Sequence, residues 1–323
     1  MKKISWPKDS DIFTIGHRSI RRGETAQVHL KVSETYSSRG ITIPISVVRG
    51  KKPGPILFVT AVVHGDEING VEIIHNLIYR SSNKNQSGTL VCVPVVNILG
   101  FYSQTRYLPD GRDLNRFFPG DPNGTLTERY AHTFFNEVIV KCHFGIDLHT
   151  AGHGRVNIPH VRGDLPHAKV RFLAESFECP IILDRKGIEG SLRRTATEKG
   201  IPTIIYEAGE SGRFQYKATQ EGVRGVIAVM EHLKMRTAKK HPRAKKPLFV
   251  KETEWIRADR GGVIDLKIRP GETVAKGQLL GINVNPFGKE VHHISSPYKG
   301  LVISTITSPV VQPGNPICHI VRL

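Results

Sequence analysis

The chain has 323 residues, of which 39% are hydrophobic, so it can build one large domain and a small one. It has no run of about 18 apolar residues, and its first residues lack the apolar segment of a secretory signal. We therefore expect a cytoplasmic protein without a membrane partner. The four cysteines, Cys92, Cys142, Cys179 and Cys318, lie far apart, which argues against a disulfide framework or a thiolate metal site.

The net charge of +17 would suit a nucleic-acid partner if the basic residues were clustered on one face. The densest basic run, residues 235–247, contains six Lys or Arg and two prolines, which indicates a solvated linker rather than a helical binding face. Elsewhere the positive charge is scattered. We expect no nucleic-acid partner and a charge excess that attracts small anionic substrates.

Residues 1–52 contain short segments in which apolar and polar residues alternate. The segments 26–32 and 41–48 predict half-buried strands that flank a central sheet.

Between residues 53 and 235, short apolar runs alternate with helical patterns, as in an α/β domain with a largely parallel sheet. The apolar runs are 55–63, 89–96, 144–149 and 203–209. The segments 69–79 and 125–140 predict helices, and the second can begin with a cap from Thr125 followed by Glu128.

Residues 236–247 form the basic linker, after which strands, glycines and prolines predominate in residues 248–323. A weak repeat with a spacing of roughly 40 residues relates 262–277 to 300–314. Two similar β-halves predict a small all-β domain.

His64 and Glu67 come directly after the first apolar run, and His149 ends the third. Because ligand sites in parallel sheets gather at the carboxyl ends of strands, we expect these side chains at one edge. Zinc binds imidazole nitrogen and carboxylate oxygen, and three such ligands leave a fourth position open for water, as catalytic sites require. Spacing alone leaves open an alternative, in which His149 is a hydrogen-bonded core histidine and His64 is merely exposed.

Glu207 follows the fourth apolar run almost directly, and Glu210 is a second candidate. A glutamate beside metal-bound water can take its proton and later pass it to the departing nitrogen. The alternative is a surface carboxylate in a turn.

The loop 105–120 contains Arg106, Arg112 and Arg116. Arginine binds a carboxylate through two parallel hydrogen bonds or stabilises an oxyanion, whereas a merely solvated loop would use lysine as readily. Together with the metal ligands, this loop predicts an anionic substrate.

In chain order these motifs resemble the succinylglutamate desuccinylase/aspartoacylase family, which belongs with the zinc carboxypeptidases. The matching segments are HGDE at 64–67, DLNRFFPGDPNGTLTER at 113–129, DLHT at 147–150 and YEAGE at 206–210. The resemblance implies a carboxypeptidase-like α/β fold with a mixed, largely parallel sheet flanked by helices. It also implies one Zn²⁺ per chain, bound by His64, Glu67 and His149, with Glu207 as the general base.

The resemblance further implies that Arg106 polarises the scissile carbonyl and that Asn115 and Arg116 bind the substrate carboxylate. Asp113 would orient a zinc-binding histidine from outside the metal's own shell. Arg194 resembles a further substrate-binding arginine, although the adjacent Arg193 leaves that assignment open.

The implied reaction is hydrolysis of the amide bond of an N-acyl amino acid or a similar carboxylate-bearing amide, with zinc and Arg106 stabilising the oxyanion. Arg112 adds a positive charge that can select a second acidic group. The alternatives are a zinc carboxypeptidase and a non-catalytic carrier or interaction protein with a degenerate hydrolase domain.

Residues 248–323 resemble a lipoyl/biotinyl-type barrel-sandwich, on the segments 269–280 and 295–302. Lys289 lies eight residues before Pro297, near the place of a lipoyl domain's modified lysine, but neither Asp-Lys-Ala nor Met-Lys-Met is present. We therefore expect a packing domain that walls the active-site mouth, limiting substrate size or mediating assembly into a homo-oligomer.

Overall fold

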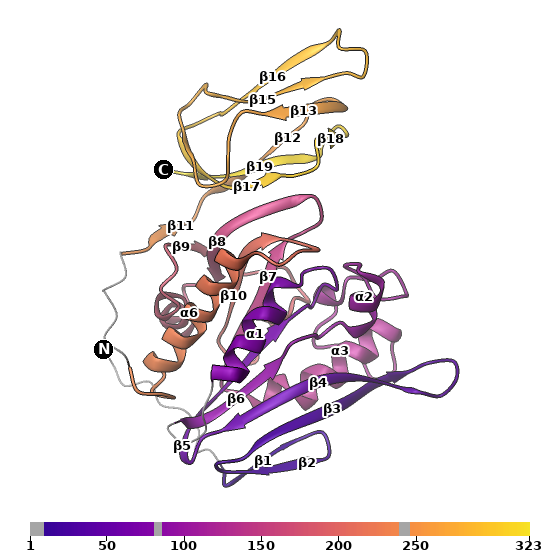
Figure 1. The fold of residues 1–323 in the computed structure, drawn as a ribbon, viewed down its shortest axis with the longest axis vertical. Helices are drawn as coiled ribbons and strands as arrows, with labels where there is room; N and C mark the ends of the chain where they lie inside the picture. Colours follow the sequence, from indigo (N-terminus) through magenta and orange to yellow (C-terminus); the bar gives the residue numbers. More distant parts are fainter. Residues whose placement is uncertain (1–9, 81–85, 239–245) are drawn as a thin grey trace.

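The computed structural model describes residues 10–80, 86–238 and 246–323, and most of the predicted basic linker, 236–247, lies outside these ranges. Within them, helices flank a 13-stranded mixed sheet, and a 4-stranded sheet and a 2-stranded hairpin complete the molecule (Figure 1). The α/β fold with a C-terminal all-β region confirms the predicted fold class. None of the helices in the described ranges is long and apolar enough to cross a membrane.

Four parallel strands at the centre of the large sheet correspond to the four apolar runs. In spatial order they are β10 (Thr203–Glu210), β7 (Phe144–Ala151), β5 (Lys52–Ala61) and β6 (Ser87–Val93). All residues of β7 are buried, because helices cover both faces of the sheet there. The carboxyl ends of these strands therefore meet at one edge.

The N-terminal strands extend this sheet beyond β6. Strand β4 (Gly40–Arg49) pairs antiparallel with β6, and β3 (Thr25–Glu34) pairs antiparallel with β4. Burial alternates along most of β3, as the half-buried pattern predicts. Strands β1 (Ile12–Ile15) and β2 (Arg18–Arg21) form the separate hairpin.

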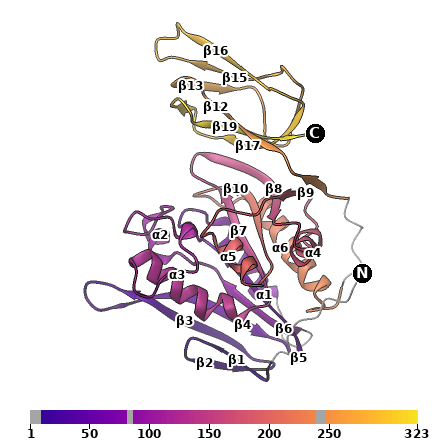
Figure 2. The same ribbon diagram turned by 180° about the vertical axis from the view of Figure 1, so that it is seen from behind.

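Helices lie on both faces of the central strands. Helices α1 (Asn69–Arg80) and α6 (Tyr216–His232) pack together on one face (Figure 1), and α4 (Ala168–Ser176) lies beside α6 (Figure 2). Helices α3 (Leu126–Glu137) and α5 (Leu192–Glu198) lie on the other face (Figure 2), and α2 (Ile98–Ser103) lies near its edge. The 3₁₀ helices are η2 (Leu114–Arg116) and η3 (Ile139–Lys141). Helix α3 begins after Thr125 with the predicted capping box to Glu128.

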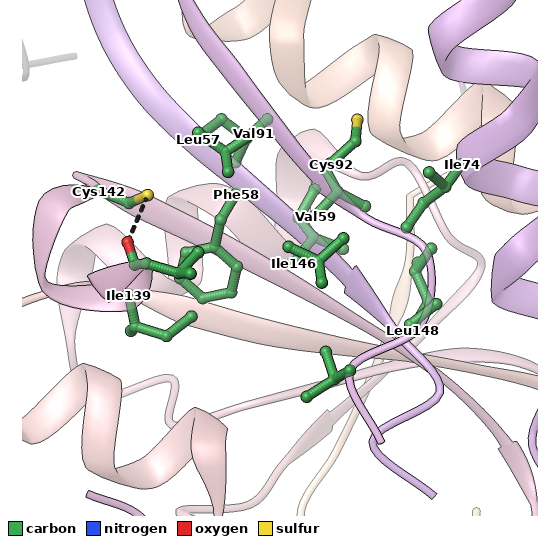
Figure 3. Close-up of a cluster of buried hydrophobic side chains, with 14 of the residues drawn as sticks. Leu57, Phe58, Val59, Ile74, Val91, Cys92, Ile139, Cys142, Ile146 and Leu148 are labelled. Atoms are coloured by element: carbon green, nitrogen blue, oxygen red, sulfur yellow. Dashed lines mark hydrogen bonds between the residues drawn. The ribbon is translucent and has the colours of Figure 1, made fainter. Parts of the chain in front are cut away.

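The core is built from neighbouring central strands (Figure 3). Phe58 and Val59 of β5 pack near Ile146 of β7, and all three are fully buried. The thiol of Cys142 donates to the Val138 carbonyl at 3.3 Å. All four cysteines are buried free thiols.

The C-terminal strands continue the large sheet instead of standing apart from it. Strand β8 (Arg155–Gly163) pairs antiparallel with β10, and β17 (Gly300–Ile306) pairs antiparallel with β8. Strands β19 (Pro316–Arg322) and β12 (Thr253–Arg257) follow in that order, and β14 (Thr273–Val274) also pairs with β17. Strand β11 (Leu248–Val250) pairs with β9 (Ile181–Asp184), which itself pairs with β8.

The second sheet has the order β16 (Val291–Ser295), β15 (Leu279–Val284), β13 (Gly262–Leu266), β18 (Val310–Val311). Main-chain hydrogen bonds between β17 and β8 join this region to the large sheet. The division into domains 53–235 and 248–323 stays a prediction.

Candidate active site

The turn after β5 directs the first two candidate ligands. Val62 has a φ of +56°, a left-handed conformation that a β-branched residue rarely adopts. A Cβ on Gly65 would lie 2.0 Å from the carbonyl carbon of Gly100 in α2, so only glycine fits there. The tight turn places His64 and Glu67 at the carboxyl edge of the sheet, where α1 begins.

His64, Glu67 and His149 come together as a buried cluster, as the sequence motifs predict. Their potential ligand atoms all lie within 4.8 Å of one another. The Glu67 carboxylate bridges the two rings, with Oε1 at 2.6 Å from His64 Nδ1 and Oε2 at 2.8 Å from His149 Nδ1. Two imidazoles and one carboxylate form a donor set that suits a divalent ion such as zinc.

The electrostatics of the cluster favour a positive charge between its members. Burial lowers the pKa of His149, but Asp147 and Glu67 outweigh it and raise that pKa well above its ordinary value. Burial raises the pKa of Glu67, but His64 and His149 outweigh it and hold that pKa well below its ordinary value. A proton or a metal cation satisfies the same preference, so the residues fit a bound ion.

Each histidine uses its other ring nitrogen to contact a carboxylate. His149 Nε2 lies 2.8 Å from Asp147 Oδ2, and Thr60 Oγ1 donates to Asp147 Oδ1 at 2.8 Å. His64 Nε2 lies 3.3 Å from Asp113 Oδ1. Carboxylates in these places fix the tautomer that turns Nδ1 toward a metal. Asp113 thus lies beside a candidate ligand, and its orienting role stays a prediction.

Glu207 lies on β10 beside His149 on β7, in register across the parallel pair. It is buried, with 8% of its surface exposed. Asn157 Nδ2 donates to Glu207 Oε2 at 3.0 Å, and an Arg162 guanidinium nitrogen lies 3.6 Å from Oε1. The alternative candidate, Glu210, instead accepts a hydrogen bond from Thr307 Oγ1.

The arginine loop brings four of its predicted residues to the site: Arg106, Asp113, Asn115 and Arg116. Arg106 donates to Asp113 Oδ2 through two nitrogens, at 3.0 and 2.8 Å, and its third nitrogen lies 3.4 Å from Glu67 Oε1. Asn115 Oδ1 accepts from the Leu192 N–H, which leaves its amide nitrogen as the group available to a substrate. Arg116 is next to it and partly exposed.

Two of the predicted substrate-binding residues lie away from the others. Arg112 is 3.5 Å from Asp110 and covers the Phe117 ring, and the Arg194 guanidinium donates to Glu198. Neither residue lines the cavity. Arg193 does so instead, because the first turn of α5 points it inward and its neighbour outward.

The site opens into a cavity of about 720 Å³. Seven lysine or arginine residues line it, but only two glutamates do. The basic residues are Arg106, Arg116, Arg155, Arg162, Arg185, Lys186 and Arg193. The C-terminal strands contribute Trp255 and His319, whose rings stack at 4.2 Å with an interplanar angle of 8°. The Arg155 guanidinium lies over the Trp255 ring.

Several residues of the site were not anticipated from the sequence. Asp147 was within reach of sequence reasoning, because residues two apart in a strand point to the same face and His149 follows it. Asn157, Arg162, Trp255 and His319 carry no motif, since strand pairing alone brings β8, β12 and β19 to the site.

A His-Glu-His cluster and an adjacent glutamate at the carboxyl edge of a mixed α/β sheet define a hydrolase-type centre. The catalytic-domain model of the succinylglutamate desuccinylase/aspartoacylase family matches residues 53–233, more than half of the chain. The chain therefore belongs to this family, whose members are deacylases that act on amide bonds of N-acyl amino acids.

The relatives are similar over most of the chain. N-alpha-acetyl-L-2,4-diaminobutyric acid deacetylase of Halomonas elongata is 26% identical, over 78% of this chain and 77% of its own. The crystal structure of a succinylglutamate desuccinylase/aspartoacylase from Rhodobacter sphaeroides is 26% identical, with a TM-score of 0.82, and covers 94% of this chain and 96% of its own. The product-bound ectoine utilization protein EutE (DoeB) from Ruegeria pomeroyi shares the fold, at 23% identity and a TM-score of 0.85 over 98% and 99%.

Proposed function

We propose that this chain is a zinc-dependent deacylase that hydrolyses the amide bond of an anionic N-acyl amino acid. The observation that carries the proposal is the placement of Glu207 beside the His64, Glu67 and His149 cluster in one basic cavity. The cluster fits a divalent ion by donor type, burial and charge.

When bound, a zinc ion supplies Lewis-acid chemistry, polarising the amide carbonyl and lowering the pKa of water from about 15.7 to about 7. Glu207 takes the proton of the attacking water and donates it to the departing nitrogen. Arg106 lies beside Glu67 and stabilises the negative charge on the carbonyl oxygen. Asp113 keeps the Arg106 guanidinium in place through two hydrogen bonds.

Asn115 and Arg116 hold the substrate carboxylate. Both residues line the cavity, and the ion pair of Arg116 with Asp113 is long, at 3.7 Å. An amide donor and a guanidinium together match the two oxygens of one carboxylate. This contact places the scissile amide toward the His64, Glu67 and His149 cluster.

The remaining basic residues favour a second anionic group on the substrate. Arg155, Arg185 and Arg193 line the cavity, and none has an ion pair within the described part of the chain. Burial lowers the pKa of Arg193 to about 10. A buried cation without a counterion is costly, so an anionic ligand that neutralises it gains affinity. The Halomonas relative is named for a diamino acid. Because the cavity of this chain is basic, we instead expect it to prefer an acidic N-acyl amino acid.

The test compares the full-length protein with Glu207→Gln on N-acetyl, N-succinyl and N-formyl amino acids. We expect a zinc-loaded parent that hydrolyses acidic substrates fastest, and a fall in kcat of at least about 100-fold in the variant. A chelator should abolish activity, and added zinc should restore it. A blocked dipeptide tests the carboxypeptidase alternative.

The proposal fails if the purified protein binds no divalent ion and the variant matches the parent on every substrate. Faster release of a carboxyl-terminal amino acid from the blocked dipeptide would favour the carboxypeptidase instead. An added lipoyl or biotinyl mass on Lys289 would support a carrier role.

A further inference from the structure

Strand β8 is where the catalytic strands meet the C-terminal strands. One of its edges pairs with β10, which carries Glu207. Along its other edge, β17 pairs with Arg155–Asn157 and β9 pairs with Val161–Gly163. Ile158–His160 fall between these two partners, at a place where Pro159 has no N–H to donate. At this gap the Ile158 carbonyl accepts its hydrogen bond from a side chain instead of a strand.

The two oxygens of Glu207 are both held from this strand. Asn157 Nδ2 donates to Oε2 at 3.0 Å, and the Arg162 guanidinium lies 3.6 Å from Oε1. Asn157 is the residue at which β17 pairs with β8, opposite Ser304. The carboxylate therefore depends for its orientation on a strand that carries none of the three candidate metal ligands.

His160 lies between the two residues that hold Glu207 and is fully buried. Its Nδ1–H donates to the Ile158 carbonyl at 2.8 Å, in the gap between β17 and β9. Its Nε2 accepts the Arg162 Nε–H at 3.1 Å. This second bond requires a neutral ring, and burial together with the Arg162 charge holds the pKa of His160 well below its ordinary value.

We propose that His160 is a positioning residue for Glu207: it fixes Arg162 through Nε2, and Arg162 with Asn157 holds the carboxylate toward the cluster. The inference rests on the proposed role of Glu207 as the base. Its consequence is that the C-terminal strands, through β17 and β8, help to set the geometry of the base. Small errors in the position of a reacting group cost about 100-fold in rate.

Two substitutions at His160 separate its two hydrogen bonds in the full-length, zinc-loaded protein. In His160→Asn the amide can reach the Ile158 carbonyl but not Arg162, whereas in His160→Gln the longer side chain can accept from Arg162 Nε. We expect kcat to fall by about 10- to 100-fold in His160→Asn, with KM and bound zinc unchanged, and to recover mostly in His160→Gln. His167→Asn, at an exposed histidine of the same region, should match the parent.

A second readout asks whether the effect passes through Glu207. In Glu207→Asp the shorter carboxylate withdraws from Asn157 and Arg162, so adding His160→Asn should cost almost nothing more. If His160→Asn does not fold, Arg162→Lys keeps the charge but lacks the Nε donor and should show the same fall in kcat.

The inference is overturned if His160→Asn and His160→Gln both match the parent, or if both are impaired to the same degree. It is also overturned if His160→Asn lowers kcat by an equal factor in the Glu207→Asp background. Failure of the proposed function looks different, because Glu207→Gln itself would then retain the parent's rate.

Discussion

At the scale of single residues, the site distinguishes between neighbours that the sequence leaves equivalent. Arg193 and Arg194 are adjacent in α5, but only Arg193 reaches the cavity. Arg193 is 5% exposed, and its Nε has no hydrogen-bond partner among the described residues. Its Nη1 donates to the Arg185 carbonyl. An uncompensated buried arginine costs stability, and an anionic ligand in the cavity would neutralise its charge.

Replacing Arg193 with methionine should therefore raise the stability of the protein and weaken substrate binding. We expect a higher free energy of unfolding in denaturant, because an uncompensated buried charge is removed. KM for an acidic N-acyl amino acid should rise by about 10-fold, the loss of one charged hydrogen bond. Arg194→Met is the matched control and should leave KM unchanged, since its guanidinium pairs with Glu198. A KM that rises only in the control would assign substrate binding to Arg194.

At the scale of elements, the arginine loop is held in place by helix α3. The helix begins with the Thr125 and Glu128 capping box, and its first turn also binds the loop. Thr127 Oγ1 donates to Asp110 Oδ1 at 2.6 Å, and the Thr127 N–H donates to Oδ2 at 3.1 Å. The loop that carries Arg106 is thus anchored by a helix whose beginning is specified locally.

Thr127→Val tests this anchor, because valine has nearly the same shape but no hydroxyl. We expect the free energy of unfolding to fall by about 1 kcal/mol, since Asp110 loses the hydrogen bond that the buried Thr127 hydroxyl donates. The less restrained loop should also raise KM. Chemical denaturation and steady-state kinetics measure the two effects, and Thr133→Val on the exposed face of α3 is the control. Unchanged stability and kinetics would show that the loop keeps its place without the anchor.

At the scale of the whole molecule, aromatic rings and arginine side chains lie together where the C-terminal strands contact the catalytic sheet. His319 stacks on Trp255 and is almost fully buried. Burial and the charges of Arg162, Arg185 and Arg155 lower the pKa of His319 to about 3. The protein therefore keeps this histidine neutral at the junction of its two parts.

This junction should make the protein sensitive to acid. An unfolded histidine has a pKa of about 6.5, so the unfolded chain binds the proton first as the pH falls. The stability that His319 contributes is complete above that pH and is lost progressively toward pH 3. Between about pH 7 and pH 5 the loss is about 2 kcal/mol.

His319→Phe keeps a flat ring beside Trp255 and removes the titrating group. Urea denaturation at the two pH values should show a smaller loss of stability in the variant than in the parent. An equal loss in both proteins would mean that His319 is not protected from the proton.

The sequence alone was sufficient for the features that depend on local pattern. Buried apolar runs predict the four central strands, because a strand covered on both faces must be apolar throughout. The motifs around His64, His149 and Glu207 predict one site, because the carboxyl ends of parallel strands meet at one edge. Thr125 and Glu128 predict the beginning of α3 by their spacing alone.

Only the tertiary structure decided the features that depend on contacts distant in sequence. No pattern in β8 or β17 indicates that they pair. The sequence therefore did not predict that Asn157, opposite Ser304, donates a hydrogen bond to Glu207. The choice between Arg193 and Arg194 depends on how α5 is rotated against the sheet, which packing sets. Local hydrogen bonding and periodicity are written in neighbouring residues, whereas the walls of the cavity are made by strands that only the complete fold brings together.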